Sequence, residues 1–201
     1  MTVPTASEGP PSGGGWRGQR LPLLVGLVGF AIVAVLAGIV LSSSDDGSAK
    51  GSLDVTDPAR FDLPTIDGAG RVRLADFEGT PVVVNFFASW CEPCKEELPD
   101  IADAARKLEG KVAFVAVNSK ELSAPSGIAL ARNNGLAEAG IILARDVGAG
   151  GSALHDAYDV RQAMPVNAFY DAGGKLRYVA PGQLTPDKLA ERLRTLFGVT
   201  L

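Results

Sequence analysis

Cys91 and Cys94 are the only cysteines of the 201-residue chain, and two residues separate them. This spacing suits thiol–disulfide exchange, in which one thiolate attacks a disulfide and a second thiol resolves the mixed disulfide. The flanking residues place Cys91 at a helix N-terminus, where unpaired N–H groups stabilise the thiolate. They thereby lower the pKa of the Cys91 thiol below the ~8.5 of a free cysteine. We therefore expect Cys91 to be the nucleophile and Cys94, one turn into the helix, to resolve.

Two other roles for the cysteine pair stay open from the residues alone. A structural zinc site needs about four ligands, and the chain adds one histidine, His155, so a carboxylate would have to complete the set. A purely structural disulfide across so short a loop would remove little chain entropy. We favour a redox-active dithiol and expect no metal and no cofactor.

The dithiol is expected between a strand and a helix. Residues 82–87 are β-branched and aromatic, as in a buried strand, and residues 96–108 carry apolar side chains at helical intervals. Pro93 suits a first helical turn because its missing N–H is not needed there. Pro99 is expected to kink the helix by removing a hydrogen bond. The apolar run 112–117 would complete a βαβ unit.

The stretch NFFASWCEPCKEELP, residues 85–99, resembles the active-site signature of the TlpA/ResA-like membrane-anchored thiol-disulfide oxidoreductases of the thioredoxin superfamily. The resemblance extends more weakly from Phe61 to the C-terminus. It implies an α/β, thioredoxin-like fold, a central mixed sheet flanked by helices. Two departures concern substrate contacts: Phe87 stands where the family often has tryptophan, and Val-Asn-Ala follows Pro165 where threonines are frequent.

The remaining elements of the fold come from local patterns. The turn 67–70 lies between two short apolar runs and predicts an N-terminal β-hairpin. Capping by Thr185 and a proline after it predict the start of a last helix. Further helices and strands are expected at the following ranges: helices at 125–135 and 152–158, strands at 141–143, 166–170 and 175–179.

The resemblance makes Pro165 the family's cis-proline, facing the dithiol. The backbone of Met164 would then pair with a substrate chain as an added strand, and Trp90, Glu92 and Pro93 join Met164 as substrate-binding residues. A trans proline that opens an edge strand is the alternative.

Exchange also needs a group that takes the proton of Cys94. Glu97 is our candidate, because it follows Cys94 by three residues on the same helix face and partial burial would raise its pKa. The resemblance implies a functional acid here, and thioredoxins usually carry an aspartate where Asn85 stands. A solvated first-turn glutamate that stabilises the helix dipole is the alternative.

Four segments are expected along the chain. Residues 1–20 are rich in Gly, Pro and Ser and predict a disordered cytoplasmic tail. Residues 21–41 carry no charge, and as a helix of roughly 31 Å they match a hydrocarbon core of about 30 Å. This length favours a retained transmembrane signal-anchor over a cleaved signal peptide. A flexible linker, 42–56, and an extracytoplasmic thioredoxin-like domain, 57–201, follow.

Charges around residues 21–41 give the orientation. Arg17 and Arg20 precede the segment and Asp45 and Asp46 follow it, and basic flanks stay cytoplasmic. We expect a single-pass protein of the cell membrane with its N-terminus in the cytoplasm. A chain with no cysteines beyond the dithiol agrees with an extracytoplasmic site, since it has no structural disulfide that its own chemistry could disturb.

The net charge of −4 and the absence of a Lys/Arg run argue against nucleic acid as a partner. Glu92 places a negative charge beside the thiolate, which lowers the reduction potential and points to a reductase. The resemblance implies protein substrates with disulfides, apocytochrome c in cytochrome c maturation being the leading candidate, and a membrane thiol-electron donor. The alternatives are a disulfide-forming oxidase of secreted proteins, a copper-handling protein, for which the cysteine spacing is wrong, and a non-catalytic thioredoxin-like module.

Overall fold

The computed structural model describes residues 57–160 and 162–201. The expected tail, membrane segment and linker, residues 1–56, lie outside this part of the chain. Within the described residues, no helix is both long enough and apolar enough to cross a bilayer.

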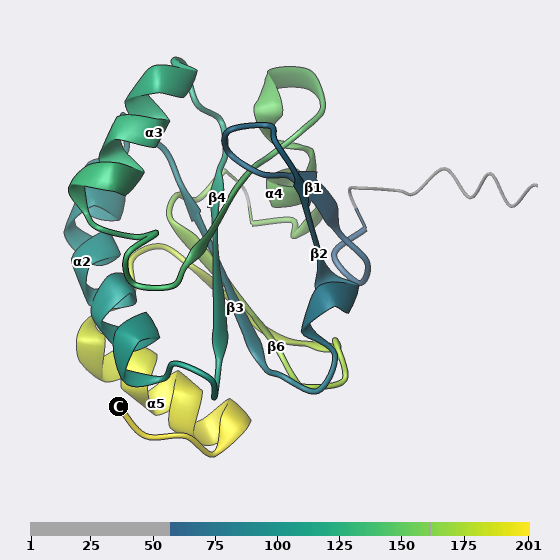
Figure 1. The fold of residues 1–201 in the computed structure, drawn as a ribbon, viewed down its shortest axis with the longest axis vertical. Coiled ribbons are helices and arrows are strands. Elements are labelled where there is room, and N and C mark those ends of the chain that lie inside the picture. The colour runs from purple at the N-terminus through teal and green to yellow at the C-terminus, as the bar shows by residue number, and fades with distance from the viewer. Residues whose placement is uncertain (1–56, 161) are drawn as a thin grey trace, which may run out of the picture. The chain divides into compact units, whose positions relative to one another are not determined.

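A five-stranded mixed sheet in the order β5-β4-β3-β6-β7 forms the core (Figure 1). Its central strand, β3 (Val82–Phe87), pairs in parallel with β4 (Ala113–Asn118), which pairs in parallel with β5 (Ile142–Arg145). On the other side of β3, β6 (Val166–Tyr170) pairs with β3 in antiparallel orientation, and β7 (Leu176–Pro181) pairs with β6 in antiparallel orientation. All six residues of β3 are buried, because layers cover both faces of the sheet. The expected mixed sheet is thereby confirmed.

Different elements cover the two faces of the sheet (Figure 1). On one face lie α2 (Glu92–Lys107), α3 (Ala124–Asn133) and α5 (Pro186–Phe197), and on the other lie α4 (Ala153–Ala157) and the N-terminal hairpin. α2 continues through Pro99 to its last residue. The Thr185 hydroxyl oxygen accepts the N–H of Lys188 at 3.4 Å and so caps α5 as predicted.

The predicted hairpin consists of β1 (Asp62–Pro64) and β2 (Arg71–Arg73), followed by a 3₁₀ turn, η2 (Leu74–Phe77). A second 3₁₀ turn, η3 (Ala149–Gly151), precedes α4. Apolar side chains of the hairpin pack on the sheet face opposite α2. The hairpin therefore closes this face of the core.

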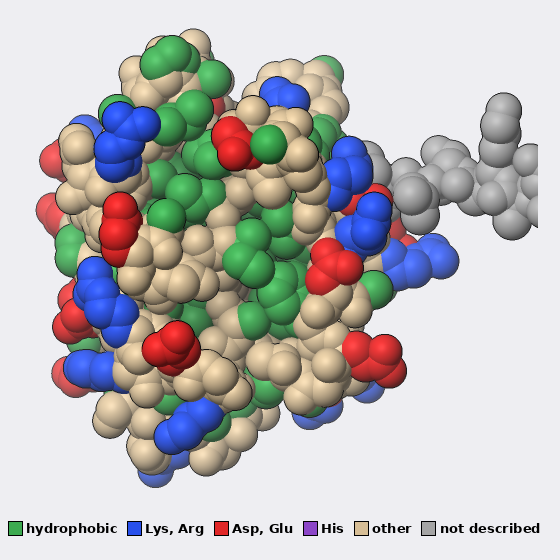
Figure 2. Space-filling view, viewed as in Figure 1, with side chains coloured by type: hydrophobic (Ala, Val, Ile, Leu, Met, Phe, Trp, Pro, Cys, Tyr) green, Lys and Arg blue, Asp and Glu red, His purple; other side chains and the backbone are tan. Residues whose placement is uncertain are grey.

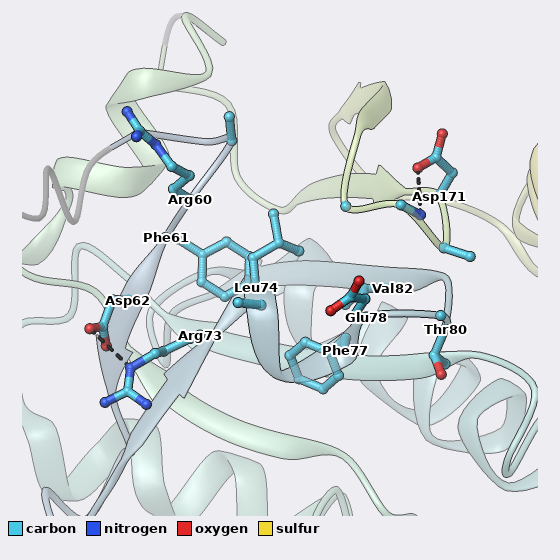
Figure 3. Close-up of a pocket in the computed structure, with 16 residues that line it drawn as sticks. Arg60, Phe61, Asp62, Arg73, Leu74, Phe77, Glu78, Thr80, Val82 and Asp171 are labelled. Carbon is cyan, nitrogen blue, oxygen red and sulfur yellow. Dashed lines mark hydrogen bonds and ion pairs between the residues drawn. The ribbon is translucent and has the colours of Figure 1, made fainter.

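A cavity of about 660 Å³ lies between the hairpin, η2 and the β6–β7 turn. Its wall is largely apolar, with Phe61, Leu74 and Phe77, and Asp62 and Arg73 form an ion pair at its margin (Figure 3). The cavity adjoins the start of β3 at Val82, whereas the cysteines follow the end of β3. It therefore lies away from the dithiol.

The surface carries charges of both signs. On the face shown in Figure 2, Lys and Arg side chains are interspersed with Asp and Glu around the margin, and apolar side chains gather in the middle. Charges of both signs are thus mixed on this face.

Gly127 of α3 lets the helix pack closely on the end of β4. A Cβ atom at this position would lie 2.5 Å from the side-chain oxygen of Asn118. The Asn118 amide has little freedom to move, because its Nδ2 donates to the Phe87 carbonyl at 3.3 Å and to Glu121 at 3.1 Å. The absence of a side chain at Gly127 therefore allows α3 to pack closely on Asn118, next to residues 88–91, the loop between β3 and α2 that we call the dithiol loop.

We predict that Gly127→Ala lowers the free energy of unfolding by ~1–3 kcal/mol, because the added methyl group overpacks this contact. Without the contact, the same change inside a helix would raise stability by about 0.5–1 kcal/mol. Urea unfolding of the full chain measures the sign. Ser126→Ala, at the exposed neighbouring position, is the control and should change stability by less than about 0.5 kcal/mol. A stabilised Gly127→Ala variant would show that Asn118 can move aside.

Candidate active site

Cys91 and Cys94 are joined by a disulfide at the start of α2. Cys91 is the N-cap residue, and the backbone N–H of Cys94 donates to its sulfur at 3.2 Å. Pro93 lies in the first turn, where no N–H is needed. Cys94 is fully buried, and Cys91 is 3% exposed. The geometry supplies a donor that would stabilise a Cys91 thiolate after reduction.

The residues around the dithiol differ in exposure. Trp90 is 47% exposed, and its indole N–H donates to the Lys120 carbonyl at 2.8 Å. Glu92 forms an ion pair with Lys95 at 2.8 Å, with 73% of the Glu92 side chain exposed. Because solvent and Lys95 both screen it, the charge of Glu92 acts weakly on the cysteines.

The Met164–Pro165 peptide bond is cis. Pro165 precedes β6, whose first residue, Val166, lies opposite Phe86 near the end of β3. The cis-proline and the dithiol loop therefore share one edge of the sheet. Met164 is half-buried and packs against the buried apolar side chains on both faces of the sheet.

Glu97 is 1% exposed and accepts hydrogen bonds from three separate elements. Asn85 Nδ2 on β3 donates to its Oε2 at 2.9 Å, and Asn167 Nδ2 on β6 donates to its Oε1 at 2.8 Å. The backbone N–H of Leu184, before α5, also donates to Oε1 at 2.7 Å. We call these three donors the Glu97 cradle. The solvated first-turn role that was the alternative for Glu97 does not fit this burial.

Two opposing effects set the pKa of Glu97. Burial, the larger effect, raises it above its ordinary value of 4.5, and Asp100 adds a small contribution in the same direction. The three donors of the cradle favour the carboxylate and lower the pKa, without cancelling the effect of burial. Because Glu97 follows Cys94 by one turn of α2, this raised pKa belongs to a group able to take a proton near the second thiol.

The two asparagines of the cradle lie opposite each other on β3 and β6. Asn85 Nδ2 also donates to Asn167 Oδ1 at 2.9 Å, while Asn85 Oδ1 is buried without a partner. Sequence analysis named Asn167 only as a departure from the family pattern. In the structure, the Asn167 side chain donates a hydrogen bond to Glu97. The available signal was a polar residue in each of two otherwise apolar strands.

His155 is buried and binds the segment before the cis-proline. Its Nε2 lies 2.7 Å from the Ala163 carbonyl, which only accepts, so this nitrogen carries a proton. The ring packs edge-on against Phe86, with centroids 5.6 Å apart. In the part of the chain that the structure describes, no group of three or more His, Cys, Asp or Glu side chains is arranged to hold a metal ion.

We predict that Glu97→Gln changes how stability depends on pH. The pKa of Glu97 is higher in the folded protein than its ordinary value of 4.5, so the folded state binds the proton more tightly. Stability is therefore lost as the pH rises from about 4.5 through the raised pKa. Glutamine cannot titrate, so the free energy of unfolding should fall less across this range in the variant. Urea unfolding at a series of pH values measures the difference. Equal slopes for wild type and variant would contradict a raised pKa, and Glu96→Gln, at an exposed position, is the control.

The chain is similar to several known proteins. The AhpC/TSA family matches residues 55–179. Thiol-disulfide oxidoreductase ResA of Bacillus subtilis is 29% identical over 178 residues, which cover 88% of this chain and 89% of ResA. Thiol:disulfide interchange protein DsbE of Pseudomonas aeruginosa is 37% identical over 106 residues, which cover 51% of this chain and 56% of DsbE.

A solved structure extends the similarity to the fold. The exposed lipoprotein thioredoxin Etrx1 of Streptococcus pneumoniae is 28% identical and superposes with a TM-score of 0.56, covering 68% of this chain and 98% of Etrx1. The resemblance found in the motif at 85–99 is confirmed. The chain therefore belongs to the AhpC/TSA family, as a thiol-disulfide oxidoreductase of the ResA/DsbE (TlpA-like) type in the thioredoxin superfamily.

Proposed function

We propose that this protein reduces disulfides of extracytoplasmic polypeptides. The observation that carries the proposal is the buried Glu97 carboxyl group, held by three donors one helical turn from Cys94. A reductase must deprotonate a buried second thiol in each cycle. Glu97 is a proton acceptor in a suitable place.

In the proposed cycle, the Cys91 thiolate attacks one sulfur of the client disulfide and forms a mixed disulfide, while the other client sulfur leaves as a thiolate. Cys94 then gives its proton to Glu97, and its thiolate attacks the Cys91 sulfur. The second client sulfur leaves, so two electrons have passed to the client and the Cys91–Cys94 disulfide has formed. A dithiol donor must return two electrons before the next cycle.

The client would bind along the sheet edge that holds the cis-proline. The backbone of Met164 is proposed to pair with an extended client segment as an added strand. Pro165 would fix this backbone, and Trp90, Glu92 and Pro93 would contact the client around Cys91. The half-burial of Met164 and the exposure of Trp90 support this arrangement, because a client can reach both.

The proposed direction of electron flow follows from charge. A Glu97 carboxylate beside Cys94 repels a negative charge on either cysteine and so disfavours the thiolate. The reduced form of the dithiol is destabilised as a result, and its reduction potential falls. Glu92 acts in the same direction, though weakly because it is exposed and paired with Lys95. Apocytochrome c before haem attachment is the client we propose, with a membrane thiol carrier as the electron donor.

The proposed location rests on the sequence of residues 1–56. A cytoplasmic tail at 1–20, a signal-anchor helix at 21–41 and a linker at 42–56 would hold the domain 57–201 outside the cell membrane. Etrx1, one of the similar proteins, is described as an exposed lipoprotein, which supports a place at the cell surface for the dithiol.

The equilibrium reduction potential of Cys91 and Cys94 tests the direction. We expect a value at or below about −230 mV, in the range of glutaredoxins and thioredoxin, for the full chain titrated against a thiol buffer. A value near about −120 mV, as for a strong oxidant, would overturn the reductase proposal and favour the disulfide-forming oxidase.

Glu97→Gln tests the role of the carboxyl group. Without a proton acceptor, the step in which Cys94 resolves the mixed disulfide should slow by a factor of about 10²–10⁴ and should follow the thiol's own ionisation. The rate is measured as a function of pH with a peptide disulfide. Glu96→Gln, one residue away and exposed, should leave the profile unchanged. An unchanged profile in Glu97→Gln would remove Glu97 from the mechanism.

A further inference from the structure

A chain of contacts joins the dithiol loop to the cis-proline through side chains that the proposed cycle does not use. It begins at the loop of residues 119–123, which follows β4 and leaves the sheet beside the dithiol loop. The Trp90 indole N–H donates to the Lys120 carbonyl at 2.8 Å. The Glu121 carboxyl group accepts five hydrogen bonds, two of them from the N–H and the hydroxyl of Ser89, both at 2.8 Å. The 119–123 loop is thus fixed to the dithiol loop.

The Lys120 side chain continues this chain of contacts to α4. Its Nζ forms an ion pair with Asp156 Oδ1 at 3.0 Å, and the same oxygen lies 3.2 Å from His155 Nδ1. The Ser152 hydroxyl donates to Asp156 Oδ2 at 2.7 Å and, more than any other group, lowers the pKa of Asp156 to about 2. Asp156 is therefore a carboxylate at neutral pH, and it faces His155 as an acceptor.

Both ring nitrogens of His155 face acceptors. Nε2 lies 2.7 Å from the carbonyl of Ala163, the residue before Met164, and Nδ1 faces the Asp156 carboxylate. A neutral imidazole carries a proton on one nitrogen only, so it would hold the lone pair of the other against an acceptor. An imidazolium donates to both acceptors. The two contacts of the buried ring therefore fit an imidazolium.

The charges around His155 fit the same form of the ring. Its own backbone N–H donates at 3.0 Å to Asp146, a buried carboxyl group that accepts four hydrogen bonds. Phe86, packed edge-on against the ring, is uncharged, and Tyr158 is neutral because burial raises its pKa well above its ordinary value of 10. Three carboxyl groups and one ammonium group lie around the ring: Asp146, Asp156, Asp159 and Lys120. A positive charge on His155 reduces this imbalance.

We propose that His155 is a positioning residue of the exchange reaction, which as an imidazolium holds the Ala163 carbonyl and thereby fixes the Met164 backbone relative to the dithiol loop. A neutral ring keeps only one of its two contacts, so loss of the proton breaks the chain of contacts at His155. A client that pairs with Met164 then has to order this backbone on binding. The inference rests on the proposed function in one respect, that the client pairs with Met164 as an added strand. It adds that this pairing depends on pH.

The protonation of His155 can be measured directly, because it is the only histidine of the chain. The full chain, carrying isotope-labelled histidine and purified without a histidine tag, is followed by NMR as the pH rises. We expect both ring nitrogens to be protonated at neutral pH. In Asp156→Asn one of them should lose its proton at a pH lower by about one unit, because a carboxylate that stabilises the imidazolium is gone. Asp187→Asn, at an exposed position of α5, is the matched control and should titrate as the wild type does. A wild type with one unprotonated ring nitrogen at neutral pH would overturn the proposal.

The effect on the reaction is measured with two disulfides and the reduced full chain. One is a peptide with a disulfide in an extended segment, which can pair with the Met164 backbone. The other is oxidised glutathione, which is too small to do so. Ionisation of the thiols changes both second-order rate constants and cancels in their ratio. We expect the ratio of peptide to glutathione to fall about tenfold as the pH rises through the titration of His155, the effect of losing one hydrogen bond to a charged group.

The variants separate this role from a merely structural one. In Asp156→Asn the fall in the ratio should move to lower pH together with the NMR titration, and in Asp187→Asn it should stay in place. In His155→Gln, whose amide can donate to Ala163 but does not titrate, the ratio should not depend on pH. A ratio that is constant with pH in the wild type, or that falls at the same pH in Asp156→Asn, would overturn the proposal. A reduction potential typical of a strong oxidant rejects the reductase direction but leaves this ratio unaffected, so the two proposals fail separately.

Discussion

A carboxyl group buried between α2 and the central sheet constrains this structure more than any other single group. Placing Glu97 in an apolar interface is costly unless donors compensate for lost water. The donors come from β3, β6 and the turn before α5, so the register of Asn85 with Asn167 must hold for the site to exist. Burial favours the protonated acid, whereas the donors favour the carboxylate. This balance suits the proton transfer beside Cys94 that we propose for Glu97.

The arrangement of strands gathers the other functional segments at one sheet edge. β3 and β4 are parallel and end side by side, so the dithiol loop and the 119–123 loop emerge together. β6 is antiparallel to β3, so the cis-proline that precedes it arrives at the same edge. His155 of α4 contacts the Ala163 carbonyl before the cis-proline, and Glu121, in the loop after β4, accepts a hydrogen bond from Ser89 in the dithiol loop. Chemistry at Cys91 thus depends on segments more than 70 residues apart in the chain.

Local patterns in the sequence were enough to place nearly every strand and helix of the described chain, because buried strands and amphipathic helices leave strong periodicities. The cysteine pair and Glu97 were found from their spacing along one helix. Asn167 was not, since its partner Asn85 lies 82 residues away and only the strand register brings the amides together. Glu121 was missed for the same reason: four of its five donors follow from a loop conformation that no short motif specifies, and the fifth comes from β4.

The direction of electron flow depends on which charged groups lie close to the dithiol in the folded chain. Read along the chain, Glu92 is the charge closest to the thiolate. In three dimensions it is exposed and paired with Lys95, so screening weakens its effect. The N-cap donor to Cys91 acts in the opposite direction, because it stabilises a thiolate and with it the reduced form. Glu97 is buried, where a carboxylate interacts most strongly with a neighbouring charge. Whether the dithiol gives or takes electrons therefore depends on the competition between the helix N-terminus at Cys91 and the carboxylate next to Cys94.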